Sequence, residues 1–255
     1  MSYDLFFMAD SGKGIDKKKF GAYFRGRRHY TVGKGQAVYQ NEDTGVAFIL
    51  DEPSEGAMAF NLNYFRPHVF GLEAAIELEA FGKAFGLNVV DPQNEGMGED
   101  VPFTREGFLR GWNAGNRFGY SAILGDRTEP VFTWPAKKVR EVWEWNYARP
   151  TEEQQEKAGA FVPGIFGVVR GKEAWSVAIW PPQCPILIPA VDAVLVPLAQ
   201  EGKESQKLGL VEWKELLPAV AKFAVKGPGL RRIGWYLRNG RRRLGRFWLR
   251  SGRMR

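Results

Sequence analysis

Amide and aromatic side chains, which suit the recognition of a partner or ligand, gather in three short stretches of this sequence. Residues 61–68 read NLNYFRPH, and their two asparagines share one face of a predicted strand because side chains alternate along a strand. Residues 111–118 read GWNAGNRF, and residues 142–147 read VWEWNY. Trp, Tyr and Arg anchor protein interfaces, and a groove for a sugar or an aromatic ligand uses the same residue types. The candidate binding residues are Asn61, Asn63, Tyr64, Arg66, His68, Trp112, Asn116, Trp143 and Trp145.

The two histidines and the single cysteine leave little material for metal or nucleophile chemistry. Neither His29 nor His68 has a second histidine at the spacing of a zinc site. His29 lies at the expected end of a helix, where the helix dipole favours a cation, and we expect it to be structural. His68 follows a strand and is the better functional candidate. Cys184 lies among prolines and is expected to pack as a small side chain. We therefore expect no metal and no cofactor.

A second reading is an enzyme whose polar groups come together only in the folded chain. Residues 11–14 read SGKG but lack the spacing of a phosphate-binding loop. The acidic residues are neighbours in sequence, so their side chains diverge, whereas paired catalytic carboxylates must converge. A concave pocket with several of the polar groups would favour the enzyme, and a flat patch of Trp and Tyr would favour a binding protein. The groups in question are Glu42, Asp43, Asn61, Asn63, Arg66 and His68.

Composition indicates an ordinary globular chain in a reducing compartment. The 255 residues are 44% hydrophobic, and nine Trp and eighteen Phe predict a well-filled core. One cysteine allows no internal disulfide. The first ten residues lack the basic start and long apolar run of a signal peptide, and no stretch approaches the roughly 18 apolar residues of a membrane span. We expect a cytoplasmic protein.

The net charge of +7 comes from the C-terminal residues 231–255, which hold ten Arg and no acid. The rest of the chain has 26 basic and 29 acidic residues, a net charge of −3. On a helical wheel, apolar and basic residues of this tail separate, which predicts a basic amphipathic helix. Such a helix could lie on an anionic membrane, on nucleic acid, or on an acidic protein that includes this chain's own body. The basic residues concerned are Arg231, Arg232, Arg238, Arg241, Arg242, Arg243, Arg246 and Arg250.

The order of periodic segments predicts an α+β fold with a mixed or antiparallel sheet and flanking helices. Each half can be written strand, helix, three strands, helix, which suggests similar halves at residues 1–125 and 126–230 before the tail at 231–255. One continuous domain is the equal alternative, and the oligomeric state stays open. The expected strands are residues 3–8, 36–40, 45–50, 57–64, 88–90, 129–134, 161–170, 174–180 and 192–198. The expected helices are residues 16–27, 72–85, 104–116, 135–147 and 212–225.

Two segments carry a resemblance to a known type of protein. Residues 39–46 read YQNEDTGV and residues 60–67 read FNLNYFRP. Together they resemble a family of uncharacterised bacterial proteins that is similar to the immunity proteins of polymorphic and type VI secretion toxin systems. The resemblance covers about residues 3–120, leaves out the tail, and carries no catalytic motif. It implies a stable scaffold that neutralises a cognate toxin by direct binding. The sequence therefore predicts a protein-binding protein, with the enzyme and the tail-tethered body as alternatives.

Overall fold

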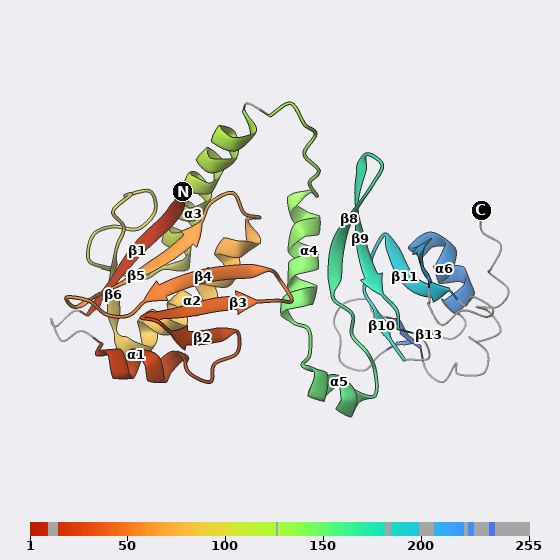
Figure 1. Cartoon of the computed structure of the whole chain (residues 1–255), viewed down its shortest axis with the longest axis horizontal. Coiled ribbons are helices and arrows are strands. Elements are labelled where there is room, and N and C mark those ends of the chain that lie inside the picture. Colours follow the sequence, from red (N-terminus) through yellow and green to blue (C-terminus); the bar gives the residue numbers. More distant parts are fainter. Residues whose placement is uncertain are drawn as a thin grey trace. The chain divides into compact units, whose positions relative to one another are not determined.

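The computed structural model describes residues 1–9, 15–125, 127–181, 185–198, 207–221, 224–226 and 235–237 (Figure 1). The chain divides into two compact units, Met1–Pro130 and Val131–Arg255. Each combines helices with β-sheet, so the expected α+β class is confirmed. In the described part of the chain, no helix has the length and apolar character needed to cross a bilayer.

Unit 1 is built on a seven-stranded antiparallel sheet with the strand order β2-β3-β4-β5-β1-β6-β7. Strand β1 pairs with β5 and β6, so the N-terminal segment forms an interior strand of the sheet. The strands are β1 Ser2–Ala9, β2 Tyr30–Gly33, β3 Gln36–Asn41, β4 Val46–Asp51, β5 Ala57–Asn63, β6 Leu87–Val90 and β7 Val101–Pro102. The helices are α1 Lys17–Phe24, α2 Val69–Phe85 and α3 Arg105–Leu124.

Alternation along the strands creates the core of unit 1. Tyr3, Leu5 and Phe7 point to the helix-covered face and are fully buried, whereas Phe6 on the opposite face is exposed. Rings from the sheet and the helices interlock there, with Phe7 edge-on to Phe81 of α2 at 5.7 Å between centroids. Burial of these large aromatic side chains stabilises the unit by about 1.5–3 kcal/mol for each one.

Three of the expected helix ends in unit 1 are confirmed, whereas α1 ends earlier, at Phe24, and α2 begins earlier, at Val69. The Asp16 side chain accepts a hydrogen bond from the N–H of Lys19, and the Thr104 side chain accepts one from the N–H of Gly107. Gly86 ends α2 in the left-handed region at φ +60°, a conformation that glycine adopts without strain. These caps satisfy backbone groups that a helix end otherwise leaves unpaired.

Helix α3 runs eight residues beyond the expected end at residue 116, although its glycines lower helix propensity. The glycines are required by close packing. A Cβ atom on Gly111 would lie 2.2 Å from the Tyr3 hydroxyl, and one on Gly115 would lie 2.1 Å from the Tyr64 hydroxyl. Tertiary contacts outweigh the low helix propensity of these glycines. A prediction from local propensity therefore ends the helix too early.

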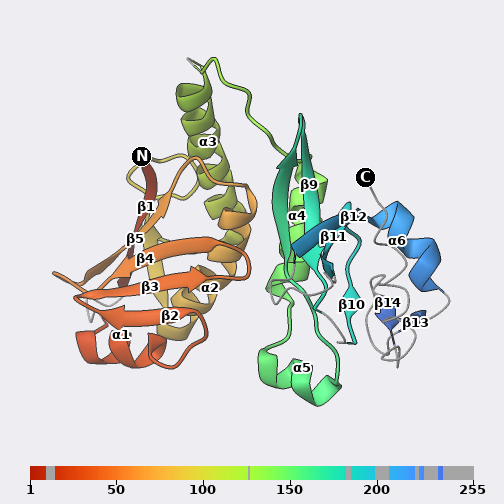
Figure 2. The same cartoon turned by 45° about the vertical axis from the view of Figure 1, so that its right-hand side comes forward.

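Unit 2 contains a four-stranded mixed sheet with the order β12-β11-β9-β8 and a three-stranded sheet with the order β10-β14-β13 (Figure 2). In the larger sheet, β9 and β11 are parallel and the other pairs are antiparallel. The strands are β8 Ile165–Arg170, β9 Glu173–Ile179, β10 Leu187–Ile188, β11 Ala193–Leu198, β12 Lys207–Glu212, β13 Ala224–Lys226 and β14 Trp235–Leu237. The helices are α4 Ala136–Tyr147, α5 Glu152–Ala158 and α6 Trp213–Val220.

One face of the larger sheet is covered by helices. Ile165, Ala178 and Val194 on that face form a buried cluster with Leu216 and Val220 of α6. Val142 and Trp145 of α4 pack against the same cluster. On the opposite face, Phe166, Ile179 and Leu208 are exposed. The opposite, more open face thus carries these exposed side chains together with the buried Val177 and Ala193.

The idea of two similar halves is wrong. Unit 1 begins with a strand in a seven-stranded sheet, whereas unit 2 begins with α4 and α5 and divides its described strands between two sheets. The expected strand at residues 129–134 is absent, because Trp134 instead turns its indole onto the sheet and donates to Ala174. Helix α5 and strand β12 were not expected.

The prediction of a C-terminal helix is also wrong for residues 235–237, the part of the tail that the structure describes. Trp235–Leu237 forms strand β14, which pairs with β10 and β13. Strand pairing supplies backbone hydrogen bonds at a place where glycines at 234 and 240 weaken a helix. The eight tail arginines named above lie outside the described residues, as do Cys184 and residues 11–14.

Packing of α2 against α3 gives a direct test of unit 1. A Cβ atom on Gly71 would lie 2.1 Å from the ring of Trp112, which is fully buried. We expect Gly71→Ala to lower the free energy of unfolding by about 1–3 kcal/mol through overpacking. Chemical denaturation followed by tryptophan fluorescence measures the change. The matched control is Gly33→Ala, where an added Cβ meets nothing within 4 Å. Equal stability of the two variants would contradict the assigned packing.

Candidate binding surface

Two of the predicted aromatic binding residues belong to the core of unit 1. The ring of Tyr64 stacks on Trp112 with centroids 5.5 Å apart and an angle of 26° between the planes. Tyr3 lies on the other side of Tyr64 at 6.5 Å. Because Trp112 is fully buried, this pair holds α3 against the sheet and offers no accessible indole surface.

Asn116, another predicted binding residue, clamps the turn that leads into α2. Its Oδ1 atom accepts hydrogen bonds from the N–H groups of Phe65 at 2.7 Å and Arg66 at 3.2 Å. Its Nδ2 atom donates to the carbonyl of Arg66 at 2.8 Å. Phe65 has φ +61°, which is costly for an aromatic residue, so the clamp stabilises a strained turn.

The remaining polar candidates in unit 1 are engaged separately. Asn61 donates to Asp4 on the uncovered sheet face, and Asn63 is exposed at the end of β5. Asp43 forms an ion pair with Arg28 at 3.3 Å. Arg66 is exposed, Glu42 is exposed, and His68 stands before the first residue of α2 without a side-chain capping bond. Of the groups in the enzyme alternative, Asn61 and Asp43 are therefore engaged by separate partners within the unit.

His29 does not behave as the helix-end cation that the sequence suggested. It follows α1 in the left-handed region at φ +69°, and its ring meets Tyr39 edge-on at 5.7 Å. Burial, followed by the charge of Arg28, lowers the pKa of His29. Because α1 ends at Phe24, His29 does not lie at the end of the helix, where the sequence had placed it.

A buried carboxylate that sequence reasoning missed organises this side of unit 1. Glu73 of α2 is 0% exposed, and its Oε1 atom accepts from the Tyr39 hydroxyl at 2.7 Å, the Asn41 amide at 2.8 Å and the Thr44 hydroxyl at 3.1 Å. Burial, followed by the hydrogen bond to Glu73, raises the pKa of Tyr39. All three donors lie within residues 39–46. The sequence signal that could have identified Glu73 is an acidic residue within a largely apolar stretch of the helix.

The two tryptophans of α4 have structural contacts. The Trp145 indole donates to the carbonyl of Pro163 at 2.8 Å, and its ring packs on the core cluster of unit 2. Trp143 stacks on Tyr147 with centroids 5.3 Å apart. Of the nine predicted binding residues, none lines the crevice of unit 2, whose aromatic side chains come from other positions.

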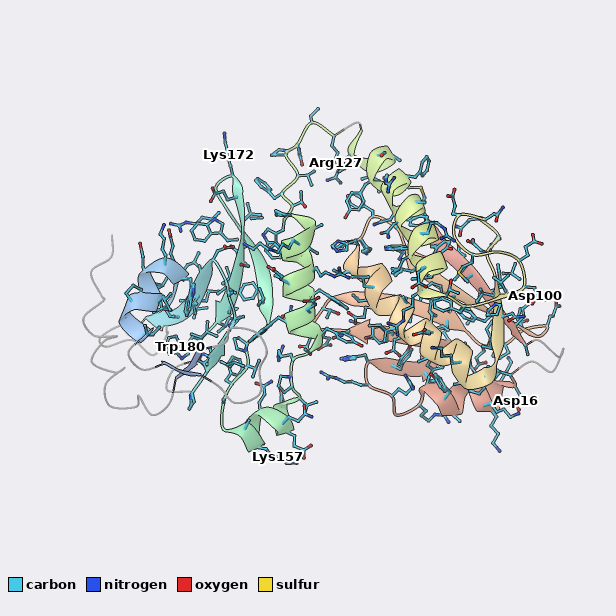
Figure 3. All side chains as sticks on the ribbon, turned by 180° about the vertical axis from the view of Figure 1, so that it is seen from behind. Asp16, Asp100, Arg127, Lys157, Lys172 and Trp180 are labelled. Carbon is cyan, nitrogen blue, oxygen red and sulfur yellow. The ribbon has the colours of Figure 1, made fainter. Side chains whose placement is uncertain are left out.

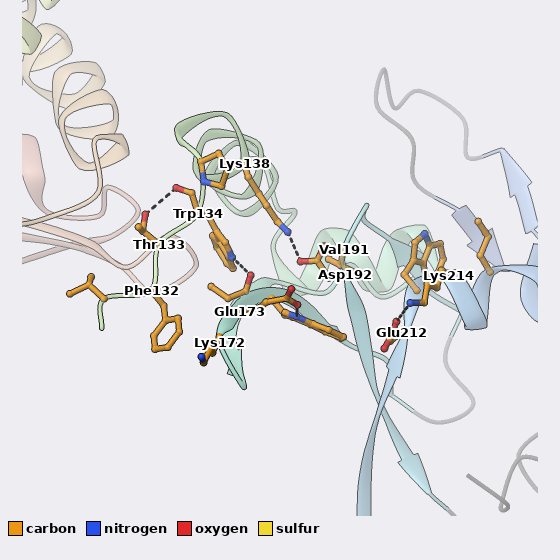
Figure 4. Close-up of a pocket in the computed structure, with 16 residues that line it drawn as sticks. Phe132, Thr133, Trp134, Lys138, Lys172, Glu173, Val191, Asp192, Glu212 and Lys214 are labelled. Carbon is orange, nitrogen blue, oxygen red and sulfur yellow. Dashed lines mark hydrogen bonds and ion pairs between the residues drawn. The ribbon is translucent and has the colours of Figure 1, made fainter. Parts of the chain in front are cut away.

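This crevice has a volume of about 850 Å³ and lies between the start of α4, the β8–β9 hairpin, the start of β11 and the start of α6 (Figure 4). Its walls combine aromatic rings with lysine and carboxylate side chains, a composition typical of interface anchors surrounded by polar groups. The aromatic lining consists of Phe132, Trp134, Trp175 and Trp213.

Trp134 forms one wall because three contacts fix its ring. The indole N–H donates to the carbonyl of Ala174 at 2.7 Å. The ring edge covers Gly167, where a Cβ atom would lie 3.3 Å from it. The ammonium of Lys138 lies 5.6 Å from the ring centroid, within range of a cation–π contact.

Asp192 joins the elements around the crevice. Its carboxylate pairs with Lys138 of α4 and accepts from the Ser176 N–H at 2.7 Å and hydroxyl at 2.8 Å. Its backbone carbonyl accepts from the N–H of Trp213 at the start of α6. Burial disfavours its ionisation, but the hydrogen bonds from Lys138 and Ser176 outweigh burial and lower the pKa of Asp192.

Trp175 forms the opposite wall on the open face of the sheet. The guanidinium of Arg170 lies 4.5 Å from its ring centroid, and its indole N–H donates to Glu173 at 2.9 Å. Arg170 in turn pairs with Glu212 at 3.2 Å, and Lys214 pairs with the other oxygen of Glu212. The hydrogen bond from Lys214, together with its charge and the hydrogen bond and charge of Arg170, holds the pKa of Glu212 below its usual range.

The acids of the crevice are thus held by neighbouring donors, whereas Lys172 has no ion pair in the part of the chain that the structure describes. It projects from the tip of the β8–β9 hairpin (Figure 3). Across the described residues, no three metal-binding side chains are grouped to hold an ion. The crevice can receive an apolar or aromatic group against its aromatic rings and a carboxylate on Lys172.

No protein family, curated protein or solved structure matches this chain. Assignment of a function therefore depends on the geometry of the two units.

The hydrogen bonds of Asn116 predict that its substitution destabilises the chain even when no binding partner is present. We expect Asn116→Ala to lower the free energy of unfolding by about 1–3 kcal/mol, because two N–H groups and a carbonyl lose their partner at a buried site. Thermal unfolding measures it. The matched control is Asn113→Ala on the exposed face of the same helix. If both variants unfold like the wild type, Asn116 does not clamp the turn.

The lowered pKa of Asp192 predicts that the stability of unit 2 depends on pH. Because its folded pKa lies below the ordinary value of 3.8, its contribution is present above that value and is lost as the pH falls through the folded pKa. We expect Asp192→Asn to cost about 1 kcal/mol at pH 7, since the side chain is partly exposed, and much less at pH 3. Calorimetry of the full chain at both pH values tests this, with Glu156→Gln as the exposed control. A cost that is the same at both pH values would count against the ionic role.

Proposed function

We propose that this chain is a cytoplasmic protein-binding protein that uses the crevice of unit 2 as its main contact. Its partner, on this proposal, is a cognate bacterial toxin, which the chain neutralises by direct binding. The oligomeric state of the complex is not part of the proposal.

The observation that carries the binding role is the partly exposed aromatic lining of the crevice beside a lysine that has no ion pair among the described residues. Indole rings with few rotatable bonds give large contact area at a low cost in conformational entropy, and such rings dominate binding energy at interfaces. Hydrogen bonds or ion pairs already hold Trp134, Trp175 and Asp192 in place. A surface that is ordered before binding loses less entropy when a partner arrives.

The crevice also limits the chemistry of the partner. Asp192 and Glu212 are paired within the chain, so a basic group on the partner would have to displace a lysine or an arginine there. Glu173, by contrast, accepts only from the Trp175 indole among the described residues. Lys172 is available to a carboxylate. The partner is therefore expected to insert an apolar or aromatic side chain that is flanked by Asp or Glu.

The toxin role is supported by the resemblance of residues 39–46 and 60–67 to immunity-type proteins. In the fold, the first of these segments surrounds Glu73 and the second contains the turn held by Asn116. Both belong to the packing of unit 1. On this proposal, unit 1 provides the scaffold that the resemblance detects, and unit 2 provides the recognition surface.

Affinity capture from the native cell tests the binding role. We expect the full chain to retain one protein in stoichiometric amount, and Lys172→Glu to weaken that complex at least about tenfold, a loss of about 1.4 kcal/mol. Trp175→Ala is expected to weaken it further, as the loss of an anchor does. The matched charge reversal is Lys18→Glu on the exposed face of α1, which should bind as the wild type does.

Growth assays then test the toxin role separately. Production of the captured protein in a host cell should stop growth, co-production of the wild-type chain should restore it, and Lys172→Glu should not. A captured protein that is harmless would refute the toxin role and leave the binding role standing. Equal capture by Lys172→Glu and Lys18→Glu would refute the crevice as the contact.

A further inference from the structure

The outer edge of strand β8 is open over a short and defined length. In the described sheet, β8 is the terminal strand, with β9 on its inner side. Gly167 lies opposite Ser176, whose N–H bonds to the Asp192 carboxylate and whose carbonyl accepts from the Asp192 N–H. Ser176 thus turns both backbone groups toward β11. In an antiparallel pair, the backbone groups of Gly167 must then face away from β9.

The same alternation turns the backbone groups of Val169 outward. Its neighbour across the pair, Ala174, uses its carbonyl for the Trp134 indole and not for β8. In the described part of the chain, the N–H and C=O of Gly167 and Val169 have no hydrogen-bond partner. The Val169 side chain is 55% exposed. An edge with free donors, free acceptors and an exposed β-branched residue is a template for a further strand.

A side chain of α4 closes this edge at one end. The Nδ2 atom of Asn146 donates to the Ile165 carbonyl at 2.8 Å, and its Oδ1 atom accepts from the Ile165 N–H at 2.8 Å. The amide therefore fills the place that a neighbouring strand would take. At the other end, the turn at Gly171, with φ +62°, leads the chain back into β9. The outward positions of β8 that remain are Gly167 and Val169, and Gly171 follows them as the first residue of the turn.

These three positions are symmetric about Val169, and we propose that β8 pairs antiparallel with β8 of a second copy of this chain. Val169 lies opposite the partner's Val169, and Gly167 lies opposite the partner's Gly171. The two glycines leave room on either side of the valine pair. A two-fold axis at Val169 makes the contact self-complementary, as a closed dimer requires.

The opposite face of the strand fits the same register. Val168 lies opposite the partner's Arg170, whose aliphatic stem can cover it. Each Arg170 is already neutralised by Glu212 of its own chain, so the two arginines near the axis add little repulsion. A register shifted toward Ile165 would bring the partner strand onto the Asn146 amide. The short length of the edge predicts a weak dimer whose population rises with concentration. This inference does not depend on the toxin or on the crevice.

A single cysteine at the axis tests the register in the full chain. With Cys184→Ser as background, Val169→Cys should form a disulfide-linked dimer under mild oxidation, because facing Cα atoms in such a pair are about 5.5 Å apart. The matched control is Leu208→Cys, 59% exposed on β12 at the other edge of the same sheet, which should stay monomeric. Equal cross-linking of both variants, or none at Val169→Cys, would overturn the proposal.

Sedimentation equilibrium gives an independent readout without cysteine. The wild type and Val169→Thr should show the same monomer–dimer equilibrium, whereas Val169→Lys should shift the dissociation constant at least about tenfold toward monomer, since like charges then face each other across the axis. A wild type that is monomeric up to the highest soluble concentration would overturn the proposal and leave the edge free for a strand of another protein.

Discussion

The arrangement of unit 2 depends on the carboxylate of Asp192. Its contacts with Lys138 and Ser176 connect α4 to β9. Its backbone carbonyl accepts a hydrogen bond from the N–H of Trp213, the first residue of α6. Three elements that are far apart in sequence therefore meet at one residue. The aromatic walls stand on these elements, so the geometry of the crevice follows from one ionised group that neighbouring donors keep charged.

The two units use their polar residues in different ways. Unit 1 buries Glu73 and Asp91 and satisfies them with hydroxyl, amide and backbone donors, as in the bond from Tyr3 to Asp91 at 2.7 Å. Such satisfied networks specify a fold but offer nothing to a partner. Unit 2 holds its ion pairs at the rim of an open crevice and leaves Lys172 and a strand edge accessible. This contrast is the physical basis for assigning scaffold and recognition roles.

Sequence periodicity predicted the fold class, most strands of unit 1 and the helix caps at Asp16, Thr104 and Gly86, because each depends on local backbone chemistry. It could not predict that Trp112 and Asn116 serve packing, since burial depends on which helix face meets the sheet. The crevice was missed for the same reason. Trp134 and Trp175 are separated by 40 residues of chain and come together only through the Ala174 carbonyl and the hairpin. The tail showed amphipathic spacing, yet Trp235–Leu237 pairs as a strand.

The central claim is that the crevice of unit 2 meets another protein in the cell. A photo-reactive phenylalanine analogue placed at Phe132, inside the crevice, tests it most directly, with the same analogue at Phe118, 67% exposed in unit 1, as the reference position. After irradiation of living cells that naturally make the protein, the account predicts one adduct of discrete mass from position 132 and none from position 118. Adducts only from position 118, or equal labelling at both positions, would contradict it.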